Sequence, residues 1–196
     1  SIAEVQFDEA FGFTNNEVRE MLEYYGFSQH YEEVKEWYDG FTFGDVKDIY
    51  NPWSITRFID SDGEFDTYWA NTSSNNLVSS LISKGSRTLK CAMEDLMNGI
   101  PVEADIDENI DFDSLESEDD AVWGLLYTTG YLKADSVNED VYTLSITNVE
   151  IYKMFTRMFR KWFARTRGSF GDFQKAFLKG DIEEMNYYMN MVTNMT

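Results

Sequence analysis

The sequence predicts a mainly α-helical fold with short β-hairpins, in which a helical first part precedes a winged-helix-like unit. Three observations favour this fold. Helix-start signals precede runs with apolar residues three and four positions apart, and only 2 prolines interrupt 196 residues. Apolar–polar alternation is confined to short segments. With 43% apolar and 16% aromatic residues, the chain can bury a substantial core.

Two helices are predicted at the start of the first part. Thr14 and Glu17 have the spacing of a capping box, and Gly26 stands where a helix C-cap is expected. Ser28 begins the second helix. Each predicted helix has one apolar face, formed by Val18, Met21, Leu22 and Tyr25 in the first and by Tyr31, Val34 and Trp37 in the second.

The segment EWYDGFTFG (36–44) predicts a turn followed by a very short strand. Asp39 and Gly40 form the turn signal, and aromatic and polar residues alternate over 41–43. The aromatic side chains of this segment and of YNPWS (50–54) are expected to form one compact cluster that holds these turns together.

Three more helices are predicted before the middle of the chain. One begins at Asn51-Pro52, because Asn is a good N-cap and Pro is tolerated at the first helical position. The others cover about 74–84 and 88–97, where apolar residues recur at helical intervals.

An acidic segment then divides the chain. Residues 103–120 (EADIDENIDFDSLESEDD) contain no Lys or Arg, and we interpret them as a connector. The predicted organisation is a helical domain over 1–102, this connector, a winged-helix-like domain over 121–168, and a C-terminal helix within 169–196 that leads toward a missing domain.

The winged-helix-like interpretation depends on the order helix, hairpin, helix. A helix is predicted over about 117–129, strands over 131–134 and 141–146, and a polar loop over 135–140. A second capping box, Thr147 and Glu150, then begins a long helix to about residue 165, and a final helix is predicted over about 172–191.

Composition limits the classes of function. A formal net charge of −20 opposes general nucleic-acid binding, because such a surface repels phosphate groups. Cys91 is the single cysteine, so we predict a reducing, cytoplasmic location and no disulfide. No apolar run is long enough to cross a bilayer, which predicts no membrane partner. From the residues at its two ends, SIAE (1–4) and NMT (194–196), we expect the chain to be a fragment of a longer protein.

The sequence predicts no catalytic residue, no metal site and no cofactor for this chain. His30 is the only histidine, and nothing near it indicates a nucleophile–base arrangement. The P-loop pattern for phosphate binding is absent. EF-hand-like spacing occurs at Asp105, Asp107, Asn109, Asp113 and Glu116. However, Ile110 occupies the position that requires glycine, so a solvated connector is the preferred interpretation.

Two groups of residues are candidates for binding. Lys153, Arg157, Arg160 and Lys161 belong to a basic run (153–167) without acidic residues, which could contact nucleic acid or an acidic partner. Pairing with the chain's own acidic connector is the preferred alternative.

The second group lies before a predicted helix. Asn71, Thr72 and Ser73 could hold an anion at the helix N-terminus, or could simply cap that helix.

Five motifs together resemble a known family. They are FGFTNNEV (11–18), EWYDGFTFG (36–44), YNPWS (50–54), YWANTSSNNL (68–77) and LLYTTGYLKA (125–134). In this order and at similar spacing they resemble a large prokaryotic family of AAA-ATPase-like proteins with a C-terminal nuclease-like domain of the PD-(D/E)XK superfamily. The resemblance covers about residues 11–163.

The resemblance implies a middle region without catalytic residues of its own. In that family the P-loop lies upstream of the matched region and the nuclease residues lie downstream, so residues 1–102 would occupy the position of a lid. We therefore expect a regulatory or coupling region that packs against a nucleotide-binding core and a nuclease-like domain. ATP and Mg²⁺ would serve only the full-length protein, as an ATPase, a nuclease or both. The alternatives are a winged-helix-like nucleic-acid-binding module and a protein-interaction scaffold.

Overall fold

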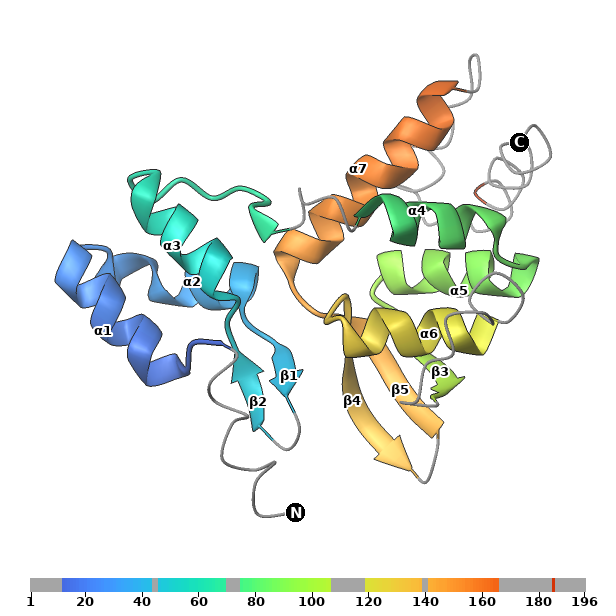
Figure 1. The fold of residues 1–196 in the computed structure, drawn as a ribbon, viewed down its shortest axis with the longest axis horizontal. Helices are drawn as coiled ribbons and strands as arrows, with labels where there is room; N and C mark the ends of the chain where they lie inside the picture. The colour runs from blue at the N-terminus through green and yellow to red at the C-terminus, as the bar shows by residue number, and fades with distance from the viewer. Residues whose placement is uncertain are drawn as a thin grey trace. The chain divides into compact units, whose positions relative to one another are not determined.

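The computed structural model describes residues 12–43, 46–69, 75–106, 119–138, 141–165 and 185. It confirms a mainly α-helical fold with short antiparallel strands (Figure 1). The chain forms two compact units, and each is described by itself. Unit 1 contains Ser1–Thr72, Gly130–Lys133 and Ile146–Met154; unit 2 contains Ser73–Thr129, Ala134–Ser145 and Phe155–Thr196.

The helices of unit 1 begin at their sequence signals except at Ser28, which lies inside a 3-10 helix and caps neither that helix nor the α-helix that follows. Its elements are α1 (Asn15–Tyr25), the 3-10 helix η2 (Ser28–His30), α2 (Tyr31–Tyr38), β1 (Phe41–Phe43), β2 (Val46–Ile49) and α3 (Pro52–Asp60). The capping box is confirmed: Glu17 N donates to Thr14 Oγ1 at 3.4 Å, and Thr14 N donates to Glu17 Oε2 at 2.8 Å. Asn51 caps α3 by accepting from Trp53 N at 2.9 Å.

The core of unit 1 is rich in aromatic rings. Tyr38 and Phe65 stack with 6.2 Å between ring centroids, and Phe58 lies 4.7 Å from Phe65. Aliphatic residues of α1 and α2, including Val18 and Val34, complete this core. The expected single cluster is wrong, because Trp53 on α3 is 55% exposed and Phe41 packs against Trp69 instead of joining this core.

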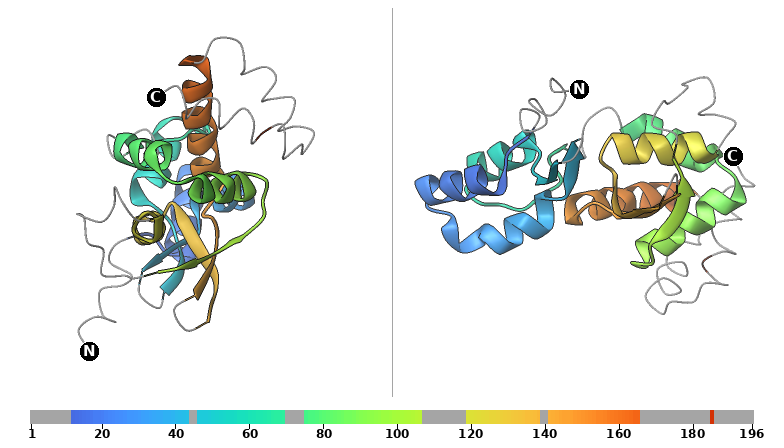
Figure 2. Two further views of the ribbon diagram at one scale, coloured as in Figure 1. Left: turned by 90° about the vertical axis from the view of Figure 1, so that its right-hand side faces the viewer. Right: turned by 90° about the horizontal axis from the view of Figure 1, so that it is seen from below.

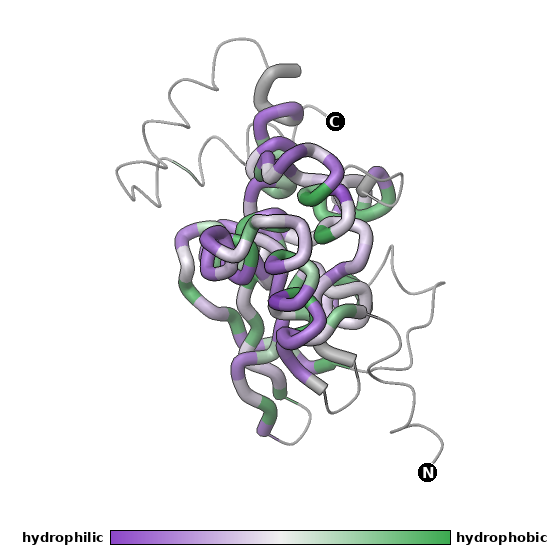
Figure 3. The backbone as a smooth tube through the Cα atoms, turned by 90° about the vertical axis from the view of Figure 1, so that its left-hand side faces the viewer, coloured by the Kyte–Doolittle hydropathy of each residue, from purple (hydrophilic) through white to green (hydrophobic). Residues whose placement is uncertain are grey.

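Unit 2 combines helices with the larger sheet. Its elements include α4 (Asn75–Lys84), α5 (Arg87–Met97), β3 (Val102–Asp105) and α6 (Asp119–Thr128), and it shares β4 (Leu132–Asn138), β5 (Val141–Ile146) and α7 (Val149–Arg165) with unit 1. The strand order is β3-β5-β4, and two further views are given in Figure 2. Hydrophobic and hydrophilic residues are interspersed along the helical turns (Figure 3), and in α1 the buried Val18 and Leu22 lie four positions apart, as in an amphipathic helix.

The strands account for most differences from the predicted elements. Residues 103–105 of the predicted connector belong to β3, which pairs with β5 so that Val102 lies opposite Leu144. Burial alternates along β3, with Val102 and Ala104 inside, and its acidic outer positions concealed this pattern in the sequence. Residues 135–138 extend β4 into the predicted loop, and β2 was not predicted.

Several predicted features lie outside the described residues. They are most of the acidic connector, the final helix over 172–191 apart from the buried Met185, and four of the five residues with EF-hand-like spacing. The fifth, Asp105, lies in β3. Within the described part of the chain, no helix combines the length and apolar character needed to cross a membrane.

A buried carboxyl on α5 generates a pH prediction. Glu94 is 6% exposed, and burial, followed by the nearby Asp95 charge, raises its pKa from 4.5 to about 7. Between these values the folded chain binds the proton more tightly than the unfolded chain, so this group's contribution to stability falls as pH rises.

The substitution Glu94→Gln removes this titrating group. We therefore expect its effect on the free energy of unfolding to be more favourable at about pH 8 than at about pH 5, by about 2 kcal/mol. Urea denaturation of both proteins at the two pH values measures this difference. An equal effect of the substitution at both pH values would contradict it.

Candidate functional site

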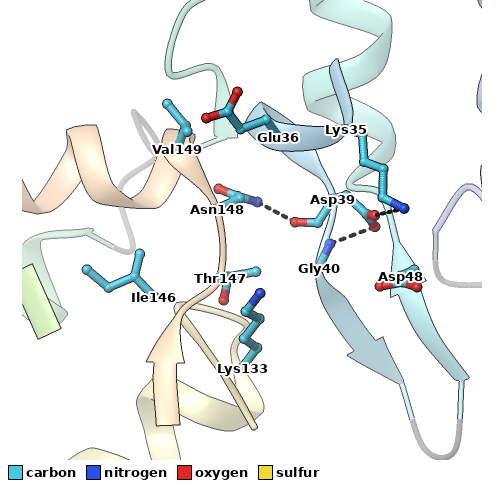
Figure 4. A pocket seen from close by; sticks show the side chains of 10 residues that line it. All are labelled: Lys35, Glu36, Asp39, Gly40, Asp48, Lys133, Ile146, Thr147, Asn148 and Val149. Atoms are coloured by element: carbon cyan, nitrogen blue, oxygen red, sulfur yellow. Dashed lines mark hydrogen bonds and ion pairs between the residues drawn. The ribbon is translucent and has the colours of Figure 1, made fainter. Parts of the chain in front are cut away.

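A polar pocket of about 410 Å³ lies in unit 1, between the segment after α2 and the segment before α7 (Figure 4). Its lining combines carboxylates, ammonium groups and the amide of an Asn. The lining residues are Lys35, Glu36, Asp39, Gly40, Asp48, Lys133, Ile146, Thr147, Asn148 and Val149.

Asp39 forms the acidic wall of this pocket at the C-terminal end of α2. Its side chain is 6% exposed; Oδ1 accepts from Gly40 N at 2.7 Å, and Oδ2 lies 3.9 Å from Lys35 Nζ. Burial raises the pKa of Asp39 above its ordinary value, and the charge of Asp48 adds to the rise. The Gly40 amide and the charges of Lys35 and Lys133 oppose it. The carboxyl is thus poised by opposing interactions, as at many binding sites.

Asp48 contributes an unusual backbone conformation. Its φ is 60°, in the left-handed region that Asp adopts more readily than most residues. The pairing of β1 with β2 shifts register between Phe41 and Phe43, which is the irregularity expected of a β-bulge. This local strain beside a polar pocket supports its selection as the candidate site.

Thr147 and Asn148 form the opposite wall and correct the predicted cap of α7. Asn148 Oδ1 accepts from Ile151 N at 3.1 Å, so Asn148 is the capping side chain. Its Nδ2 donates to the Asp39 carbonyl at 2.8 Å. Thr147 Oγ1 instead donates to the Gly130 carbonyl at 2.8 Å. The Thr147/Glu150 capping box is therefore wrong, because both side chains have tertiary partners.

Glu150 is a buried carboxyl next to this site, one residue beyond the lining residue Val149. Its side chain is fully buried; Oε2 accepts from Ser54 Oγ at 2.8 Å and Oε1 from Trp69 N at 2.6 Å. The first turn of α7 is a favourable place for a carboxylate, because the helix dipole is positive there. Glu150 thus joins α3, the segment around Trp69 and α7.

Two glycines bring the chain segments close together. Gly40 has φ +99°, and a Cβ there would lie 2.8 Å from the Thr147 carbonyl oxygen. Gly130 has φ +81°, and a Cβ there would overlap the ring of Phe41. Trp69 lies beside the same contact, 5.4 Å from Phe41 between ring centroids. Only glycine fits both the conformation and the space at these two positions.

The lining defines what the pocket can do chemically. It offers carboxylates, two ammonium groups, a hydroxyl and an amide, which suit recognition of polar groups. No histidine, cysteine or serine lines it, so it lacks a nucleophile–base pair of the common kinds. No group of three or more His, Cys, Asp or Glu residues could hold a metal among the residues that the structure describes.

The predicted binding residues do not lie in this pocket. Lys153 is exposed, with Nζ 4.5 Å from the centroid of the Trp37 ring. Arg157, Arg160 and Lys161 are exposed on α7, and both arginines interact with other residues. Asn71, Thr72 and Ser73 lie outside the described residues.

Neither His30 nor Cys91 lines the pocket. His30 lies in η2 with Nδ1 2.9 Å from Glu33 Oε2. Cys91 is a half-buried thiol on α5.

The pocket escaped prediction from the sequence because its parts are far apart in the chain. Asp39 and Asn148 are 109 positions apart. One signal was available: Asn148 is also a strong N-cap residue, and assigning it the cap would have released Thr147 and Glu150 for other contacts.

Comparison of the chain with protein-family models, with curated proteins and with solved structures finds no match.

A pair of glycine substitutions tests the close contact at the pocket. Gly26 has φ +83° with open space where a Cβ would lie, whereas Gly40 has φ +99° and faces the Thr147 backbone. Gly26→Ala should lower the free energy of unfolding by about 1 kcal/mol, because of the backbone conformation alone. Gly40→Ala should cost about 2 kcal/mol more, because a backbone atom must move.

Urea denaturation of the two variants measures this difference. Equal losses of unfolding free energy in the two variants would show that the segments containing Gly40 and Thr147 are not held in close contact.

Proposed function

We propose that this chain is a non-catalytic coupling region of an AAA-ATPase-like, nuclease-associated protein of the cytoplasm. One observation carries the proposal: four of the five motifs behind the family resemblance meet at one set of contacts in unit 1. EWYDGFTFG supplies Phe41, YNPWS supplies Ser54, YWANTSSNNL supplies Trp69, and LLYTTGYLKA supplies Gly130 and Tyr131. The residues that carry the family resemblance are thus used for tertiary contacts.

The pocket supports a coupling role for these contacts. The Asp39 carbonyl and the Asn148 amide join the end of α2 to the cap of α7. A change at either end alters the position of a 17-residue helix that extends beyond the site. Small movements of this kind are a usual means of passing a nucleotide-dependent change between parts of a protein. The proposed partners are an upstream nucleotide-binding core, which would hold ATP and Mg²⁺, and a downstream nuclease-like domain.

The first test separates coupling from catalysis. The isolated chain, incubated with ATP and Mg²⁺, should release phosphate no faster than buffer alone. The nucleotide-binding core encoded in the same reading frame should bind the chain with a Kd that differs about tenfold between its ATP and ADP states, a typical allosteric coupling. Hydrolysis by the isolated chain, or equal Kd values in the two states, would refute the proposal.

A nucleic-acid-binding function is the second candidate, and one observation favours it. Lys153, Arg157, Arg160 and Lys161 are all exposed on α7 at spacings of three and four residues, so they share a helical face. The formal charge of −20 and the exposed Asp135 on β4 oppose this function.

A gel-shift assay at low salt distinguishes the two candidates. If α7 binds nucleic acid, a duplex probe should be shifted, the affinity should fall with added salt, and Arg157→Glu should abolish the shift. If the chain acts only as a coupling region, neither the unaltered chain nor the Arg157→Glu variant should shift the probe.

A further inference from the structure

The C-terminal end of α1 exposes two adjacent aromatic side chains. Tyr24 is 82% exposed and Tyr25 54% exposed. Their rings contact edge to face, with 4.9 Å between centroids and 82° between planes. Neither ring contributes to the core of unit 1, which α1 meets through Val18 and Leu22. Folding therefore does not explain why two tyrosines occupy these positions.

The charges around this pair are opposite to those that would stabilise the helix. The C-terminal end of a helix is the negative end of its dipole, where Lys and Arg are favourable. The last turn of α1 contains no basic residue and instead includes Glu23. Glu20 lies one turn before Tyr24, so Glu20, Glu23 and Tyr24 share one exposed face.

Backbone amides of Gly26 and Phe27 cap the last carbonyls of α1, but no described cation of unit 1 pairs with the carboxylates at this end. Among the described residues, the side chains of Glu20 and Glu23 take part in no ion pair or hydrogen bond. The one cation on α1, Arg19, lies over the Tyr31 ring with its guanidinium carbon 3.7 Å from the centroid. Local arrangements that disfavour the isolated fold are typical of positions kept for binding.

We infer that the Glu20–Tyr25 end of α1 is a docking surface for an arginine-containing basic segment of a partner protein. Charge complementarity identifies the occupant: two unpaired carboxylates and the helix C-terminus attract a cation, and two tyrosine faces can stack on a guanidinium group. Arginine fits better than lysine, because its planar group stacks on rings while it donates to carboxylates. This surface is independent of the coupling function proposed above.

Fluorescence anisotropy tests the surface with a labelled Gly-Arg-Gly-Arg-Gly-Arg peptide and its lysine counterpart at low salt. The arginine peptide should bind more tightly. The double substitution Tyr24→Ala/Tyr25→Ala, which changes no charge, should raise the Kd about fivefold or more. Glu20→Gln/Glu23→Gln should do the same.

The matched control removes two charges elsewhere. Glu103 and Asp105 are exposed on β3 in unit 2, and Glu103→Gln/Asp105→Asn should change the Kd less than about twofold. The proposal would be overturned if the control variant lost as much affinity for the arginine peptide as the Glu20→Gln/Glu23→Gln variant, or if the tyrosine variant kept an unchanged Kd. Either result would show nonspecific attraction of the peptide to an acidic protein.

A measurement on the unaltered protein guards against misfolded variants. Ring-proton signals of Tyr24 and Tyr25, assigned by NMR, should shift on titration with the arginine peptide and saturate with the same Kd. Signals that do not move would also overturn the proposal.

Discussion

The buried carboxylate of Glu150 is the interaction on which the arrangement of unit 1 depends. A charge removed from water costs several kcal/mol unless hydrogen bonds replace its hydration. Ser54 Oγ and Trp69 N supply those bonds from two other parts of the chain, and the first turn of α7 supplies a favourable dipole. These donors can satisfy Glu150 only when α3, the Trp69 segment and α7 are together, so the carboxylate specifies their arrangement.

The position of Glu150 also determines the candidate site. Asn148 and Thr147 immediately precede it, and they reach the Asp39 and Gly130 carbonyls only if the first turn of α7 is correctly placed. The pocket is therefore a consequence of how α7 begins. A polar site built this way responds to movement of the helix, which is the physical basis of the coupling role proposed for it.

Local signals predicted the local structure, and their failures have a physical explanation. Thr14 and Asn51 cap their helices as expected, because each has its partner within three residues. Thr147 had the same signal, but a distant carbonyl competed for its hydroxyl. Similarly, β3 was hidden because its partner strand is about forty residues away, and Trp53 resembled core residues in type although α3 turns it outward. Neither the local signals nor the family resemblance indicated the pocket, which required the three-dimensional arrangement of distant segments.

The discontinuous composition of unit 1 has a consequence for synthesis on the ribosome. Trp69 and Glu150 are 81 positions apart, so the backbone amide of Trp69 has no carboxylate to bind until a further 81 residues have been made. At usual translation rates this interval is on the order of 10 s. During this interval the aromatic core of α1 to α3 lacks the contacts with Glu150, and the nascent chain is accessible to proteases and chaperones. Unit 1 is thus completed by its last segment, after most of unit 2 has emerged.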